Sequence, residues 1–191
     1  MALDELYSVW CSDLYRYEGR CNKKLIIKYL ILNPGYKYTF FMRLCHHLAK
    51  TDKRLIKPLY LVFRMILRHY MYKYGISIDP NTNIGEGFYI GHFGSIVVNS
   101  KAVIGKNCNI SQDVTIGQAN RGKNIGYPII GENVYIGPGA KIIGAIHIGN
   151  NVAIGANCVV TKDIPDNSVV VGVPGQVISF KGSEGYVNNT V

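Results

Sequence analysis

Aliphatic residues recur every six positions through the second half of this chain. They stand at Ile78, Ile84, Ile90 and Ile96, resume after a step of eight over 104–116, and run again over 130–160, mostly with glycine next in the chain. An amphipathic helix would need apolar residues every three or four positions, and simple strand alternation does not explain the turn glycines and asparagines. A period of six instead predicts short strands joined by tight turns. Three strands would close one coil, and stacked coils would bury a column of Ile and Val.

The corners of such coils need residues that tolerate positive φ. The asparagines that suit these corners are Asn81, Asn83, Asn107, Asn109, Asn150 and Asn151. The period is interrupted by a short insertion after Ile96 and by a longer one after Ile116, "GQANRGKNIGYP". In a solenoid such an excess leaves as a loop on one side, and loops there usually line a binding face. We therefore expect a loop over 118–129.

Charge and aromatic residues divide the chain into two regions near residue 76. Residues 1–75 hold 14 Lys and Arg against 5 Asp and Glu, with ten of the 14 tyrosines, whereas residues 76–191 hold 7 of each charge. The sequence predicts an α-helical region over 1–75, a β-helix over 76–178 and a loose C-terminal tail over 179–191.

Several classes of protein have no support in the sequence. The most apolar stretch, 58–70, is interrupted by Arg64 and Arg68, so we expect no membrane span. The first residues lack a basic-then-apolar signal, which favours a cytoplasmic protein. No GxxxxGK[ST] loop is present, which leaves nucleoside triphosphate hydrolysis unsupported. The five cysteines form no CxxC pair, and we interpret all of them as free thiols of a reducing compartment.

Three segments carry a resemblance to a known family. "FYIGHFGSIVVNSKAVIGKNCNISQDVTIG" (88–117) resembles the catalytic stretch of the serine acetyltransferase-like branch of hexapeptide-repeat acyltransferases. "NPGYKYTFFMRLCHHLAK" (33–50) is similar to a helix of that branch, and "VTKDIPDNSVVVGVPGQVI" (160–178) to its closing segment. The resemblance implies a mainly β protein, a left-handed parallel β-helix preceded by a small α-helical region, that forms trimers, or pairs of trimers, and uses acetyl-CoA without a metal.

His92, in "FYIGHFGS", is the expected general base. Acetyl transfer to a hydroxyl requires a group that takes the proton, and imidazole has a suitable pKa. Serine acetyltransferases carry an orienting Asp fifteen residues before this His, where the present chain has Ser77. Asp79 could replace it, or it could be a turn residue beside Pro80. Asp113 is the second candidate for the orienting partner, because Ile110 falls one coil after Ile90. His147 is interpreted as structural, and two β-helix histidines are too few for the three-histidine zinc site of carbonic anhydrases.

The acyl donor is expected along an edge of small residues. By resemblance, Gly117, Gln118, Ala140 and Ala156 would contact pantetheine, Lys162 a phosphate, and Pro174 the adenine. For Lys162 the alternative is an exposed lysine, and for the small residues it is corner geometry alone.

The acceptor is where the chain departs from serine acetyltransferases. That family has an Asp directly before the catalytic His and an Arg-His pair before the loop proline, whereas this chain has Gly91 and Gly126-Tyr127. Loss of ionic partners weakens recognition of serine. An acceptor site formed with Asp79, Gly91 and Tyr127 would suit a neutral sugar, as in enzymes that O-acetylate surface-polysaccharide precursors. The alternatives are a serine O-acetyltransferase and a non-catalytic trimeric scaffold.

The basic segment 16–73 has three interpretations. It could be a helical cap with a solvated basic face. It could also be attracted to anionic lipid, or to a lipid-linked sugar, at the inner face of the membrane. Nucleic-acid binding has no recognised motif here, and we expect none.

Overall fold

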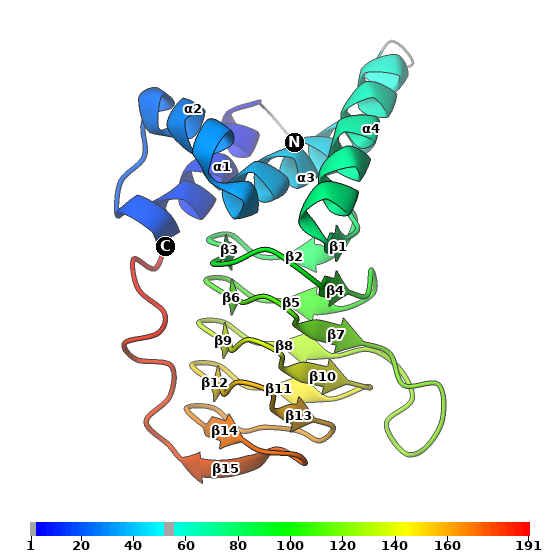
Figure 1. Ribbon diagram of the computed structural model, residues 1–191, viewed down its shortest axis with the longest axis vertical. Coiled ribbons are helices and arrows are strands. Elements are labelled where there is room, and N and C mark those ends of the chain that lie inside the picture. The colour runs from blue at the N-terminus through cyan, green and yellow to red at the C-terminus, as the bar shows by residue number, and fades with distance from the viewer. Residues whose placement is uncertain (1–2, 52–55) are drawn as a thin grey trace.

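Four helices form one end of the molecule and a parallel β-helix forms the rest (Figure 1). The computed structural model describes residues 3–51 and 56–191. The helices are α1 (Leu3–Glu18), α2 (Lys23–Leu32), α3 (Pro34–Ala49) and α4 (Lys57–Tyr74). Asparagine side chains cap two of them, because Asn22 accepts from Leu25 N and Asn33 from Tyr36 N. Within the described ranges, no helix is long and apolar enough to cross a membrane.

Within the described residues, fifteen short strands follow the helices, and they lie in three sheets. The first sheet holds β1 (Ile76–Ile78), β4 (Ile96–Val98), β7 (Thr115–Gly117), β10 (Lys141–Ile143) and β13 (Val159–Val160). The second holds β2 (Asn83–Ile84), β5 (Val103–Ile104), β8 (Ile129–Ile130) and β11 (His147–Ile148). The third holds β3 (Tyr89–Ile90), β6 (Asn109–Ile110), β9 (Tyr135–Ile136), β12 (Ala153–Ile154), β14 (Val169–Val171) and β15 (Gln176–Ser179). Each of the first four coils contributes one strand to each sheet, and the fifth contributes β13 and β14, with an isolated bridge between Ile164 and Ile148 beside the second sheet. The predicted fold class is confirmed.

The repeat isoleucines stack in register inside the coils. Ile76 pairs with Ile96, Ile84 with Ile104 and Ile90 with Ile110. All the strands pair in parallel except β15, which is antiparallel to β14. The stacked side chains are almost fully buried and form one continuous core with residues of α3 and α4. The six-residue period therefore encodes one buried side chain per strand.

The predictions for the corner asparagines and for the long insertion after Ile116 are confirmed in part. Asn107 and Asn151 have positive φ, as do Asn133, Asn157 and Asn167, which the sequence prediction did not name. Asn83 and Asn109 instead begin strands. The long insertion leaves the β-helix as a loop closed by hydrogen bonds between Ala119 and Gly126 (Figure 1).

Helix α3 joins the helical region to the first coils. Gly35 lies against Ile90, and an added Cβ at Gly35 would overlap the Ile90 carbonyl oxygen. Tyr38 is fully buried, donates to Ile78 O at 2.9 Å and accepts from Ile78 N at 3.1 Å. The "NPG" start of this helix thus permits a close approach that a larger residue would prevent.

The C-terminal tail is ordered along its length, whereas the sequence predicted a loose one. It runs back along one corner of the β-helix toward the helical end (Figure 1). Ser183 N donates to Asn151 O, Asn109 Nδ2 to Tyr186 O, and Asn107 Nδ2 to Val191 O. The ring of Tyr186 stacks on Tyr135 at 4.6 Å. Polar side chains at the corners of the coils therefore hold the tail. Because these partners belong to the coils, the sequence of the tail itself shows no apolar pattern that would predict the contact.

The prediction that all five cysteines are free thiols is wrong for two of them. Cys11 and Cys21 form a disulfide with a Cα–Cα distance of 5.3 Å. The chain reverses after α1, where Gly19 has a φ of 65°, and this brings Cys21 beside Cys11. Cys45, Cys108 and Cys158 are free and buried.

Candidate active site

His92 lies at the corner between β3 and β4, in the first coil. Its side chain is exposed, and together with Phe93 and Gln112 it lines a surface cavity of about 360 Å³. Gly94, with a φ of 116°, turns the chain directly after these residues. The corner position explains why a bulky imidazole can stand between the two glycines of "FYIGHFGS", because corner side chains project away from the core.

Gln112 is a lining residue that the sequence prediction missed. The pairing of Ile90 with Ile110 places position 112 on the coil directly beyond position 92. The same register was available from the repeat, so the signal was present in the sequence. A glutamine amide carries both donors and an acceptor, which suits contact with an imidazole or a hydroxyl.

Asp113, the expected orienting partner, lies one residue beyond Gln112, the position that faces His92 on the next coil. Its backbone N–H donates to Gly94 O at 2.8 Å, and its carboxylate lies 3.0 Å from Lys141 Nζ. Asp113 has a φ of 57°, the corner conformation that directs its side chain along the face toward the next coil. In this structure its carboxylate therefore pairs with Lys141, and contact with His92 stays a prediction.

Asp79 is held at the junction with α4. One carboxylate oxygen lies 3.1 Å from Arg64 Nη2, and the other accepts from Asn81 N at 2.8 Å. These contacts match the turn interpretation of Asp79. Ser77 lies in β1 beside Val97.

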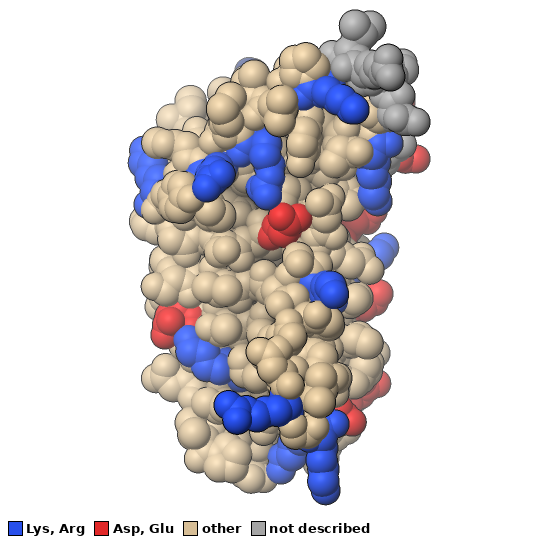
Figure 2. Space-filling view, turned by 90° about the vertical axis from the view of Figure 1, so that its right-hand side faces the viewer, with Lys and Arg blue, Asp and Glu red and all other residues tan. Residues whose placement is uncertain are grey.

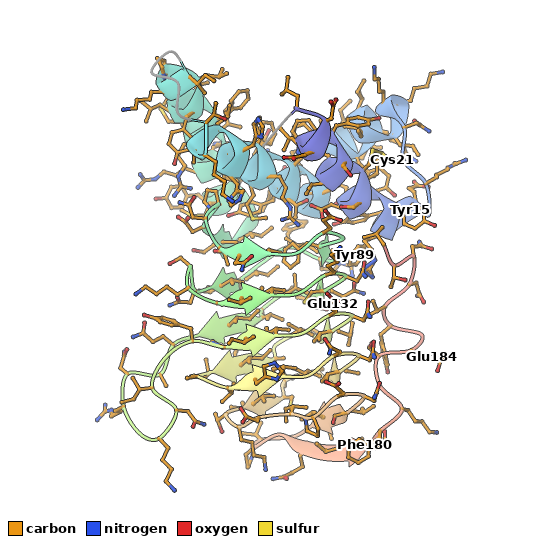
Figure 3. The ribbon with its side chains drawn as sticks, turned by 180° about the vertical axis from the view of Figure 1, so that it is seen from behind. Tyr15, Cys21, Tyr89, Glu132, Phe180 and Glu184 are labelled. Carbon is orange, nitrogen blue, oxygen red and sulfur yellow. A yellow bond between two sulfur atoms is a disulfide. The ribbon has the colours of Figure 1, made fainter. Side chains whose placement is uncertain are left out.

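Gly91 and Tyr127 lie on different parts of the surface. Gly91 lies two residues after Tyr89. A Cβ added at Gly91 would lie 3.1 Å from atom Cε1 of the Tyr89 ring. Figure 3 shows Tyr89 in the coil nearest the helices. Tyr127 closes the long loop, and Lys101 Nζ lies 5.2 Å from the centre of its ring. Within a single chain, Tyr127 therefore does not line the cavity that His92, Phe93 and Gln112 form.

The residues expected to contact acetyl-CoA follow one side of the β-helix below His92. Gly117 ends β7, and Gln118, Ala156, Lys162 and Pro174 are exposed. Lys162 Nζ donates to Gln176 Oε1 at 3.3 Å. Ala140 differs, because it is fully buried and its carbonyl already accepts from Thr115 N at 3.0 Å. Its methyl group belongs to the core, so a contact with pantetheine would have to come from its neighbours.

Histidines elsewhere in the structure have other partners. His46 Nδ1 lies 2.7 Å from Pro80 O, which indicates a hydrogen bond from the ring to that carbonyl. His147 is exposed in β11, and its backbone N–H donates to Asp163 at 2.8 Å. In the parts of the chain that the structure describes, no three His, Cys, Asp or Glu side chains are grouped as a metal site would require.

Comparison with known proteins identifies relatives of this arrangement. Residues 127–162 match the family model "Bacterial transferase hexapeptide (six repeats)". The serine acetyltransferase of Helicobacter pylori strain J99 is 35% identical over 150 residues, which cover 78% of this chain and 84% of that protein. The chain belongs to the serine acetyltransferase family. The serine acetyltransferase of Synechococcus elongatus is 34% identical over 156 residues, 82% of this chain.

Solved structures agree with this membership in the serine acetyltransferase family. The Neisseria gonorrhoeae serine acetyltransferase in complex with serine has a TM-score of 0.71 and 31% identity, covering 92% of this chain and 70% of that one. The Brucella abortus serine acetyltransferase has a TM-score of 0.76 and 28% identity, covering 94% and 71%. The present chain spans 62% and 58% of the lengths of the relatives from Synechococcus elongatus and Staphylococcus epidermidis.

Proposed function

We propose that this chain is an acetyl-CoA-dependent O-acetyltransferase with His92 as general base and serine as acceptor. The observation that carries the proposal is the exposed imidazole of His92 in a cavity at a β-helix corner, in a member of the serine acetyltransferase family. A corner imidazole has open space on the side away from the core, where an acceptor hydroxyl can reach it.

Transfer would proceed directly between the two substrates. The imidazole of His92 removes the hydroxyl proton as the acceptor oxygen attacks the thioester carbonyl. The tetrahedral intermediate then loses the coenzyme A thiolate, which takes the proton from the imidazolium. The products are an O-acetyl ester and free coenzyme A, and neutral His92 is restored.

The donor site would be completed in a homotrimer. In a single chain Gln118, Ala156, Lys162 and Pro174 are exposed and Gly117 is half-buried. A second copy would supply an opposite wall and enclose the pantetheine arm. Lys162 would then face a phosphate and Pro174 the adenine. Tyr127, which lies outside the cavity of its own chain, would be free to approach the site of a neighbour.

A second candidate acceptor is a neutral, polyhydroxylated molecule such as a sugar of a surface-polysaccharide precursor. Phe93 favours it, because this side chain lines the cavity beside His92 and is 51% exposed. Its ring also packs at 5.5 Å from that of Tyr74. An aromatic ring beside the base suits the apolar face of a sugar ring better than the charged groups of serine. Gly91, in place of a carboxylate, adds no partner for an ammonium group.

Thiol release from acetyl-CoA tests the proposal and separates the two acceptors. The purified protein is assayed with serine and with a panel of free and lipid-linked sugars. We expect serine-dependent release that falls at least about 100-fold in His92→Ala, with an unchanged melting temperature. His147→Ala is the matched control and should keep full activity. Release with sugars alone would select the second candidate. Failure to bind acetyl-CoA at all would overturn both and indicate a non-catalytic scaffold.

A further inference from the structure

Helix α2 presents an apolar face to solvent. Ile27, Ile31 and Leu32 are 59%, 67% and 68% exposed. Ile27 and Ile31 are one turn apart, so they form a continuous strip together with Leu32. Exposed aliphatic residues that occur singly are ordinary, but a strip along one short helix is a contact surface.

The helix does not need this strip for its own packing. Its opposite face already packs into a separate core, where Ile26 is buried among Leu14 and Tyr36, with Leu25, Tyr29 and Leu30 beside it. Helix α2 therefore has apolar residues on two faces, whereas a surface helix normally has one apolar and one polar face. The outer strip is thus available for a surface outside this chain.

Lysines border the strip. Lys24 and Lys28 are exposed and lie one turn apart on the same side, and Lys23 is exposed at the start of the helix. Neither α2, α3 nor α4 contains an Asp or Glu. On the face shown in Figure 2, Lys and Arg side chains lie over the helical end and also over the far end of the β-helix.

Helix α4 repeats the pattern at the same end of the molecule (Figure 1). Leu61, Val62 and Met65 are 59%, 46% and 64% exposed, and Arg68 is exposed one turn further on. Two helices at this end therefore combine exposed aliphatic residues with basic ones. An interfacial helix has this composition, because its apolar side chains enter the acyl boundary while Lys and Arg meet anionic headgroups.

We propose that the helical end docks on an anionic lipid bilayer, with the Ile27, Ile31 and Leu32 strip of α2 inserted at the headgroup boundary. A second copy of the chain is the less favoured occupant. In a twofold contact the same patch faces itself, so Lys23 and Lys24 of both copies would meet without a carboxylate on α2 to neutralise them, whereas Lys28 already lies 3.6 Å from Glu18 Oε1 of α1. An anionic bilayer supplies that negative charge. The active site and its acceptor do not enter this proposal.

Co-sedimentation of the full chain with vesicles tests it. Vesicles of phosphatidylcholine alone are compared with vesicles that also contain phosphatidylglycerol. We expect binding only to the second kind, and weaker binding as salt rises. Ile27→Ser with Ile31→Ser should reduce the partition coefficient by roughly tenfold or more. Lys23→Gln with Lys24→Gln should reduce it by about fivefold for each lysine.

Matched control variants at the far end of the molecule distinguish docking through α2 from non-specific binding to vesicles. Val173 and Ile178 are 71% and 62% exposed there, and Val173→Ser with Ile178→Ser should leave vesicle binding unchanged. Lys181→Gln is the matched charge control. Equal binding to both vesicle types, or α2 variants that bind as the wild type does, would overturn the proposal. Sedimentation velocity without lipid gives a further check, since a smaller assembly in the Ile27→Ser and Ile31→Ser variant would assign the strip to a contact between copies.

Discussion

Arg16 Nη2 donates a hydrogen bond of 2.7 Å to Asn109 Oδ1 across 93 residues of sequence. The same guanidinium donates to Gly87 O at 3.2 Å and to Asn188 O at 2.9 Å. Arg16 is only 5% exposed, so one buried side chain joins α1, the coils and the C-terminal tail. A buried cation is tolerated here because three oxygens from three segments surround it.

The first prediction is that Arg16→Met destabilises the fold by about 3 kcal/mol, because it leaves buried oxygens without a donor. Urea unfolding measures the loss of stability. The control is Arg20→Met, at an exposed arginine just after the end of α1, which should cost less than about 0.5 kcal/mol. Equal losses in the two variants would show that the junction does not depend on Arg16.

The repeat made the β-helix predictable, while the tail and the helical end were predicted less well. Aliphatic residues at a spacing of six determine which side chain of each strand points inward, and Ile90 opposite Ile110 followed from that spacing together with the two-residue insertion after Ile96. The tail has no such signal. Its contacts come from the polar side chains of Asn107 and Asn109 and from the ring of Tyr135, which lie far away in sequence.

The sequence singled out His92 as the candidate base, and it did not single out Gln112, which lines the same cavity. His92 stood out as a titratable residue among corner glycines. Asp113 was chosen because Ile110 falls one coil after Ile90, but this register places Gln112 opposite His92, one residue before Asp113. The Cys11–Cys21 disulfide depends on the reversal after α1, and a scattered cysteine pattern does not reveal such a reversal.

A second prediction distinguishes the two residues beside His92. We expect Gln112→Ala to lower kcat by about tenfold or more, because the amide lines the cavity with the base. Asp113→Asn should lower kcat by less than about threefold, since its carboxylate pairs with Lys141 on the exposed surface. Steady-state kinetics with acetyl-CoA and the active acceptor measures both. The opposite order of effects would establish Asp113 as the residue that orients His92.

A third prediction concerns the start of α3. Gly35→Ala should destabilise the protein by about 2 kcal/mol or more, because the new methyl group overlaps the Ile90 carbonyl and separates α3 from the first coil. The control is Gly122→Ala in the long loop, where an added Cβ meets no atom within 4 Å and only its φ of 91° opposes the change. Thermal unfolding followed by circular dichroism compares the two variants. A melting temperature of Gly35→Ala at or above that of Gly122→Ala would contradict the close approach.

A fourth prediction concerns the disulfide between α1 and the turn that follows it. Its loss in Cys11→Ser with Cys21→Ser should lower the free energy of unfolding by about 2 to 3 kcal/mol, since the closed loop is short. Mass spectrometry of the alkylated protein without reductant checks the bond itself. Labelling of both residues in the native protein would show that the thiols are free. Cys45→Ser is not a suitable control, because that residue is buried, so the comparison is with the reduced wild type.

The last prediction is a loss of stability in mild acid that arises at α3. Burial lowers the pKa of His46, the nearby cations Lys50, Arg43 and His47 act in the same direction, and the hydrogen bond to Pro80 O opposes them. The pKa of His47 is also lowered, mainly by burial. The unfolded chain therefore takes up these protons first, at pH values near 6.5, while the folded chain takes them up only at lower pH. Stability should hold above that value and fall as the pH drops below it. Urea midpoints at about pH 7.5 and pH 5.5 should differ less in His46→Gln than in the wild type, while His69→Gln, at an exposed histidine of α4, should keep the full difference. If all three proteins lose the same stability, the acid sensitivity arises from carboxylates and not from α3.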